Sequence, residues 1–128
     1  MQHGYFQGCA VGDVDGDGFD DLFLTSFGRH ILWQNVGDGT FRDATMEFGI
    51  DIDTWGTSAA FADFNRDGHL DLFVTNYIQT TDDLPKLCPN RNSPDGYVQC
   101  PPTAFRAADD MLLVSDGRGR LRDVTQTA

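Results

Sequence analysis

The chain has 128 residues, the usual size of one domain, and 40% of them are hydrophobic, which is enough to fill a core. Its 9 basic residues against 20 acidic residues give a formal net charge of −11, so phosphate backbones and anionic membranes would be repelled. No apolar run approaches the roughly 20 residues of a membrane span, and no signal peptide is visible at the N-terminus. These features argue against a nucleic-acid partner and a membrane span. The excess of carboxylates is then explained either by a solvated acidic surface or by cation binding.

The first half of the chain consists of short strand-like stretches joined by turns. Residues 9–14 form an apolar run in which Cys9 is expected to be a small buried hydrophobe. Residues 22–25 are continuously apolar or β-branched, which is typical of a strand covered on both faces. Residues 30–34 and 41–45 flank a Gly-Asp-Gly turn and predict a hairpin. Together these stretches predict four antiparallel strands.

The second half repeats the first and contains one long insertion. Residues 63–75 align without a gap with residues 13–25, at an offset of 50. Residues 115–125 align with residues 35–45 at an offset of 80, so the second copy is longer by 80 minus 50, or 30 residues. These extra residues, 78–108, hold all five Pro residues.

The second copy predicts the same four strands, at residues 59–64, 72–77, 111–114 and 121–125. Four short strands in a repeat of about 50 residues suit a propeller blade, whose neighbours cover both of its faces. The sequence therefore predicts an all-β fold of two four-stranded antiparallel β-propeller blades. The expected boundaries are residues 1–56 and 57–128, with the insertion at 78–108.

An Asp-rich loop follows the first strand of each repeat, with the pattern Asp-x-Asp/Asn-x-Asp-Gly-x-x-Asp. Calcium takes about six to eight oxygen ligands, which alternate side chains of a tight loop can direct to one point, with Gly allowing the sharp turn. The expected ligands are Asp13, Asp15, Asp17, the carbonyl oxygen of Phe19 and Asp21 in the first loop, and Asp63, Asn65, Asp67, the carbonyl oxygen of His69 and Asp71 in the second. Magnesium fits less well because it prefers strict octahedral geometry and retains its waters. The pattern predicts two calcium ions.

Other readings of these loops fit less well. An EF-hand requires a bidentate Glu at its twelfth position, where this chain has Leu24 and Val74, and the flanks are strands rather than helices. Plain Asp-Gly turns are the other alternative. Two loops with the same pattern argue against it, as does the repulsion among four carboxylates without a cation. Asn65 replaces one Asp, so we expect the second site to carry less charge and to be the weaker one.

Cys88 and Cys100 bracket a Pro-rich stretch and are interpreted as a disulfide, which would imply an oxidising compartment. Two free thiols in a loop are the alternative. A zinc site is the least favoured reading, since no nearby His or CxxC supplies a ligand set.

Residues 62–76 and 32–45 resemble the FG-GAP/VCBS repeat family, whose blades form the calcium-binding propeller heads of integrin α chains and many secreted bacterial proteins. Residues 100–105, followed by 110–112, are similar to its ASPIC/UnbV or cartilage-acidic-protein branch. The Gly-Ala-Pro of the integrin-type signature is missing. The resemblance implies a propeller of about seven blades, so two blades imply a segment of a longer protein or several copies that assemble.

The resemblance and the loops together lead to a non-enzymatic, calcium-stabilised scaffold for adhesion or for binding a protein or a carbohydrate. The alternative is part of a secreted propeller enzyme, a polysaccharide lyase or hydrolase with structural calcium. No arrangement of basic residues demands catalysis, and the G-x-S-x-G and G-x-G-x-x-G motifs are absent. We therefore expect no catalytic residues and an extracellular, periplasmic or cell-surface location.

Overall fold

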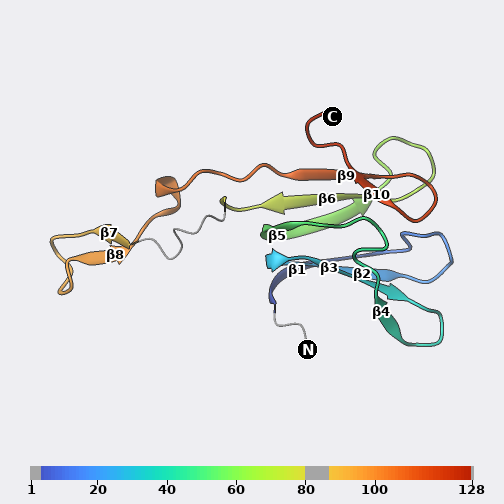
Figure 1. The fold of residues 1–128 in the computed structure, drawn as a ribbon, viewed down its shortest axis with the longest axis horizontal. Helices are drawn as coiled ribbons and strands as arrows, with labels where there is room; N and C mark the ends of the chain where they lie inside the picture. The colour runs from blue at the N-terminus through green and yellow to red at the C-terminus, as the bar shows by residue number, and fades with distance from the viewer. Residues whose placement is uncertain (1–3, 80–86, 128) are drawn as a thin grey trace.

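The computed structural model describes residues 4–79 and 87–127, and there the chain is all-β apart from one 3-10 turn, η1 (Pro102–Ala104), as predicted (Figure 1). In chain order the strands are β1 (Tyr5–Gly12), β2 (Asp21–Arg29), β3 (Ile31–Asn35), β4 (Phe41–Asp43), β5 (Asp53–Ala62), β6 (Asp71–Asn76), β7 (Leu87–Pro89), β8 (Tyr97–Gln99), β9 (Met111–Ser115) and β10 (Leu121–Asp123). Within these residues, no helix has the length and apolar composition that a membrane crossing requires.

Eight of the strands form two four-stranded antiparallel units, in the orders β1-β2-β3-β4 and β5-β6-β9-β10. In the first unit, Leu24 of β2 pairs with Cys9 on one side and with Ile31 on the other. The end of β2 pairs with the start of β5, where Phe27 stands opposite Trp55, and this pairing joins the units into one curled sheet (Figure 1). The predicted architecture of two antiparallel blades is confirmed.

The strands begin earlier than the apolar pattern indicates. β1 starts at Tyr5 and β5 at Asp53, because both strands find hydrogen-bonding partners on β2 before their apolar runs begin. The expected division of the chain between residues 56 and 57 therefore falls inside β5. Both strands end at the residue before the Asp-rich loop, Gly12 and Ala62, where the backbone turns away from the sheet.

One hydrophobic core is built from both units. Its buried members are Ala10, Val14, Phe23, Leu32, Ala44, Phe48, Ile50, Ile52, Leu72, Val74, Leu113 and Leu121. The rings of Phe23 on β2 and Phe61 on β5 meet edge to face, with their centroids 6.5 Å apart. The connection between β4 and β5 closes this core, since the Phe48 carbonyl accepts a hydrogen bond from the Leu121 amide at 2.8 Å.

A hydrogen-bonded Asp-x-Thr turn fixes the third strand of each unit. The Thr45 hydroxyl donates to Asp43 Oδ1 at 2.5 Å, and the backbone N–H of Leu32 donates to the Thr45 oxygen at 3.0 Å. In the second unit the Thr125 hydroxyl donates to Asp123 Oδ1 at 2.5 Å, and its oxygen accepts from the N–H of Leu112 at 3.1 Å. The two units are thus equivalent in hydrogen bonding as well as in strand order.

The first unit leaves one apolar face open. The expectation that Cys9 is buried is wrong: Cys9 is exposed on β1, and Val11 on the same face is 60% exposed. The residues 50 positions later, Ala59 and Phe61, pack against the common core instead. No unit covers the equivalent surface of the first repeat among the described residues, and this explains the exposure of Cys9. We call this surface the leading face, and it consists of Cys9, Val11, Leu22 and Leu24.

The second unit leaves the opposite face open. Ala10 and Phe23 of the first unit are buried in the core, whereas their equivalents Ala60 and Phe73 are exposed and partly exposed. Phe64, which is 51% exposed, lies against Phe73 with the ring centroids 6.3 Å apart. We call this surface the trailing face, and it consists of Ala60, Phe64, Phe73 and Leu112.

The insertion of the second repeat leaves the sheet between β6 and β9. An isolated bridge between Ile78 and Ala107 closes its base, and the β7–β8 hairpin extends away from the two units (Figure 1). Cys88 and Cys100 form the predicted disulfide, with their Cα atoms 5.0 Å apart. Part of the predicted insertion, residues 80–86, lies outside the described residues.

His30, at the turn between β2 and β3, is fully buried as a neutral ring. Its Nδ1 accepts from the backbone N–H of Ser26 at 3.2 Å, and its Nε2 lies 3.1 Å from Thr54 Oγ1. The Thr54 hydroxyl donates to Asn76 Oδ1 at 2.7 Å, so it accepts from His30 Nε2–H. Burial lowers the pKa of His30 to about 4, although the charge of Asp53 acts in the opposite direction.

This buried imidazole should make stability depend on pH below neutrality. The pKa of His30 falls from 6.5 to about 4 on folding. At pH values between these two, His30 is therefore protonated in the unfolded chain and neutral in the folded chain. The stability that comes from the neutral His30 is fully present above pH 6.5. We expect the free energy of unfolding to fall by about 3 kcal/mol as the pH falls towards 4. Urea unfolding at fixed pH, with a chelator present, should show a flatter profile for His30→Gln. Identical profiles for the two proteins would contradict the assignment.

Candidate metal centre

The connection from β1 to β2 folds around the side chains of its own acidic residues. Asp13 accepts from two backbone N–H groups, that of Asp17 at 3.0 Å and that of Gly18 at 2.9 Å. Asp15 Oδ1 also accepts from the Asp17 N–H, at 3.1 Å. Asp17 Oδ1 accepts from the N–H of Phe19 at 2.9 Å. The spacing of Asp residues at alternate positions is therefore what shapes the loop.

The connection from β5 to β6 is built in the same way. Asp63 accepts from the N–H groups of Asp67 at 3.0 Å and Gly68 at 2.9 Å. Asn65 Oδ1 accepts from the Asp67 N–H at 2.9 Å, and Asp67 Oδ1 accepts from the N–H of His69 at 2.9 Å. The 50-residue sequence repeat is thus also a repeat of hydrogen bonds.

The last acidic residue of each loop is buried and ties the loop to the third strand of its unit. Asp21 is 0% exposed; it accepts from the Val14 N–H at 3.1 Å and from the Asn35 N–H at 2.9 Å. Asp71 is also 0% exposed, and it accepts from Phe64 at 3.0 Å and Ser115 at 2.9 Å. Burial raises the pKa of the Asp21 carboxyl, while its two backbone donors act in the opposite direction.

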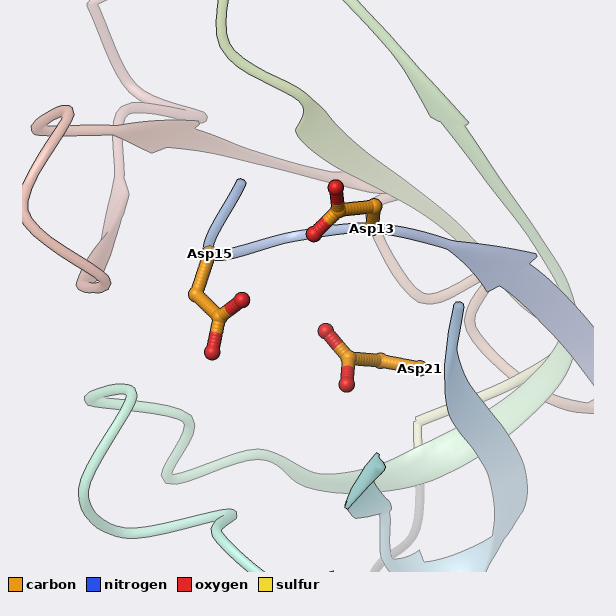
Figure 2. Close-up of side chains that lie close together, drawn as sticks. All are labelled: Asp13, Asp15 and Asp21. Carbon is orange, nitrogen blue, oxygen red and sulfur yellow. The ribbon is translucent and has the colours of Figure 1, made fainter. Parts of the chain in front are cut away.

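Three carboxylates of the first loop converge. Asp13, Asp15 and Asp21 each offer an oxygen within 4.8 Å of the others, and Figure 2 shows the three side chains turned towards a common space. Three carboxylates with no nitrogen or sulfur donor are a hard oxygen set that suits calcium. Asp17 lies outside this group of three, and one of its oxygens accepts from the Phe19 N–H. The three converging carboxylates of the first loop therefore fit a calcium ion.

The second loop carries less charge at the equivalent point. Its third position is Asn65, whose Nδ2 donates to Asp67 Oδ2 at 2.8 Å. Hydrogen bonds from the His69 N–H and from Asn65 lower the pKa of the Asp67 carboxyl. Among the residues that the structure describes, a cluster of three acidic groups is found only in the first loop. The two loops thus share a backbone arrangement but differ in the side chains at the third loop position, Asp15 and Asn65.

An aromatic ring connects each loop to the hairpin turn beside it. The ring of Phe19 lies 2.6 Å from the position that a Cβ on Gly37 would take. The ring of His69 lies 2.8 Å from the corresponding position on Gly117. A side chain at Gly37 or Gly117 would have to displace the ring, so the seventh loop residue packs against the hairpin turn.

One side chain at the first loop was not predicted as a site residue. Gln34 on β3 donates through Nε2 to Asp15 Oδ2, and its Oε1 is buried without a hydrogen-bond partner among the described atoms. It lies 13 positions after Asp21, outside the Asp-rich pattern, so spacing gives no signal for it. Its alignment with Val114 at the offset of 80 is the one sequence feature that could have marked it as different between the repeats.

Residues 13–74 match the family model of the FG-GAP-like repeat. Over 73 residues, or 56% of this chain, the sequence is 40% identical to cartilage acidic protein 1 of Xenopus tropicalis. Identity to the proteins of that name from Homo sapiens and Mus musculus is 38% and 36% over the same length. The aligned segment spans 11% of each relative. The expected resemblance to the repeat family and to the cartilage-acidic-protein branch is confirmed.

Gly68 offers a test of the loop backbone. Its φ of +89° lies in the left-handed region, and no atom lies within 4 Å of the position of an added Cβ. We expect Gly68→Ala to cost about 1–2 kcal/mol through backbone conformation alone. Arg66→Gly is the matched control, because Arg66 has a φ of +63° where the first loop has Gly16. We expect Arg66→Gly to leave the free energy of unfolding unchanged. Equal losses in metal-free urea unfolding would contradict the backbone explanation.

Proposed function

This chain contains an FG-GAP-like repeat, and from that premise we propose that it is a non-enzymatic repeat scaffold stabilised by calcium in both Asp-rich loops. The observation that carries the proposal is the convergence of Asp13, Asp15 and Asp21 within 4.8 Å. Like charges at such distances repel unless a cation or protons balance them. The second loop supports a second ion because its backbone repeats the first, hydrogen bond for hydrogen bond.

The geometry favours a structural role for the metal over a catalytic one. The loop carboxylates accept hydrogen bonds from their own backbone, and Asp21 and Asp71 are fully buried against the sheet. A bound calcium would neutralise these carboxylates and hold the loop in its folded form. Because such a site does not exist in the unfolded chain, the free energy of binding would add to the free energy of folding.

Removing the metal should therefore destabilise the protein. At a free calcium concentration 100 times the dissociation constant, each site should add about 2.7 kcal/mol, so chelation should lower the melting temperature. Asp13→Ala and its equivalent Asp63→Ala should each reduce the calorimetric stoichiometry from two ions to one. Asp51→Ala, which removes an exposed carboxylate outside both loops, is the control and should keep both ions. An unchanged melting temperature on chelation would refute calcium stabilisation.

We place this scaffold in an oxidising, extracellular setting. The Cys88–Cys100 disulfide supports this location, since disulfides persist in secreted and cell-surface proteins. The similar proteins are named for cartilage, a tissue rich in extracellular matrix, which is consistent with this location.

We also propose that the leading and trailing faces each receive another blade of this repeat type. The packing between the two units is the template, because Phe61 of the second unit meets Phe23 of the first. The residues equivalent to this pair are Val11 on the leading face and Phe73 on the trailing face. The two open faces are therefore chemically complementary, and they would combine head to tail in the same way.

For the isolated chain, this proposal predicts concentration-dependent association between copies. Val11→Glu and Ala60→Glu, one on each face, should both shift the mass measured by light scattering towards a monomer, because each would bury a charge in the contact. Val98→Glu is a control on the distant β7–β8 hairpin, where Val98 is 38% exposed. A wild-type chain that stays monomeric at all concentrations would contradict docking between copies.

A further inference from the structure

We propose that Gln34 is a positioning residue for the first calcium loop and makes that loop the higher-affinity site of the two. The inference rests on the proposed function, because it assumes that calcium binds to the loops. It assigns a role to a residue of β3 that lies outside the Asp-rich pattern.

The contact between Gln34 and Asp15 comes from outside the loop. Asp15 Oδ1 is already held by the N–H of Asp17 at 3.1 Å. Asp15 Oδ2 is held by Gln34 Nε2, so both oxygens of this carboxylate have fixed directions. The carboxamide of Gln34 makes no competing contact through Oε1, which is buried and unpaired among the described atoms. Asp15 is therefore the hydrogen-bond partner of the Gln34 carboxamide among the described residues.

A neutral donor is well suited to hold a carboxylate that must also bind a cation. A cationic side chain would offset the charge of Asp15 and compete electrostatically with the ion, whereas an amide orients the oxygens and leaves the charge in place. Arg42, which pairs with Gln34 across β3 and β4, interacts electrostatically with Asp15 but forms its ion pair with Glu47, with its Nη2 3.1 Å from Glu47 Oε1. Gln34 thus fixes Asp15 within 4.8 Å of Asp13 and Asp21 without neutralising it.

The second repeat serves as an internal comparison. Leu22 pairs with Trp33 in the first unit and Leu72 pairs with Leu113 in the second, so the residue after each partner is equivalent. That residue is Gln34 in the first unit and Val114 in the second. Valine has no donor, and the amide in the second loop comes from Asn65, which donates to Asp67 within the loop. Among the described residues, a side-chain donor from the neighbouring strand reaches the third loop position only in the first loop.

The test measures calcium affinity by titration calorimetry, one loop at a time. In an Asp63→Ala background, in which calcium binding by the second loop is removed, the measured heat comes from the first loop. There, Gln34→Val should raise the dissociation constant about 10- to 100-fold, as is usual when a group that orients a ligand is removed. The reciprocal test uses an Asp13→Ala background, in which Asn65→Asp with Val114→Gln should bind calcium more tightly than Asn65→Asp alone.

Two further readouts separate positioning from general stability. Metal-free urea unfolding of Gln34→Val should change little, whereas the rise in melting temperature on adding calcium should shrink. A lower metal-free stability with an unchanged dissociation constant would overturn the inference and leave the proposed function standing. Absence of calcium binding in the wild-type chain would overturn both. An unchanged affinity in the reciprocal variant would also count against Gln34, since it would show that a donor at this position does not matter.

Discussion

The structure of each repeat depends on one buried carboxylate that belongs to two elements at once. Asp21 closes the Asp-rich loop through the Val14 N–H and holds the third strand through the Asn35 N–H. Asp71 does the same with Phe64 and Ser115. A buried charge is costly unless it is bonded or paired, and two N–H donors on each carboxylate reduce that cost without removing it. The loop is therefore built around a negative charge that a cation would stabilise further.

Much of this arrangement could be predicted because it is local. The hydrogen bonds that shape the first loop connect residues two to five positions apart, such as Asp13 to Gly18, so the nine-residue Asp pattern contains nearly all the information needed. The same is true of Asp43 and Thr45, two positions apart. Repetition then extended the local pattern to the fold, since a second loop 50 residues later implied a second unit of the same kind.

The features that could not be predicted depend on contacts between distant parts of the chain. The apolar run around Cys9 suggests burial, but its exposure is decided by whether another unit lies on that face. The start of β5 at Asp53 depends on pairing with Arg29, which hydrophobic periodicity does not reveal. Gln34 reaches Asp15 only because the register of β2 and β3 brings it there. Register follows from the assembled sheet, so spacing along the sequence alone could not place this residue.

Strand β3 connects the Asp-rich loop of the first unit to the hydrophobic core. Asn35 at its end is held by Asp21, and Leu32, fully buried in the core, is held by the oxygen of Thr45. Any change that moves the Asp21 carboxylate would therefore shift a strand that also pairs with β2 and β4 and carries Leu32 into the core. A cation bound among Asp13, Asp15 and Asp21 would fix one end of this strand, while the Asp-x-Thr turn fixes the middle. The loop would then stabilise the blade as a whole, because the strand it anchors is the one that carries Leu32 into the shared core.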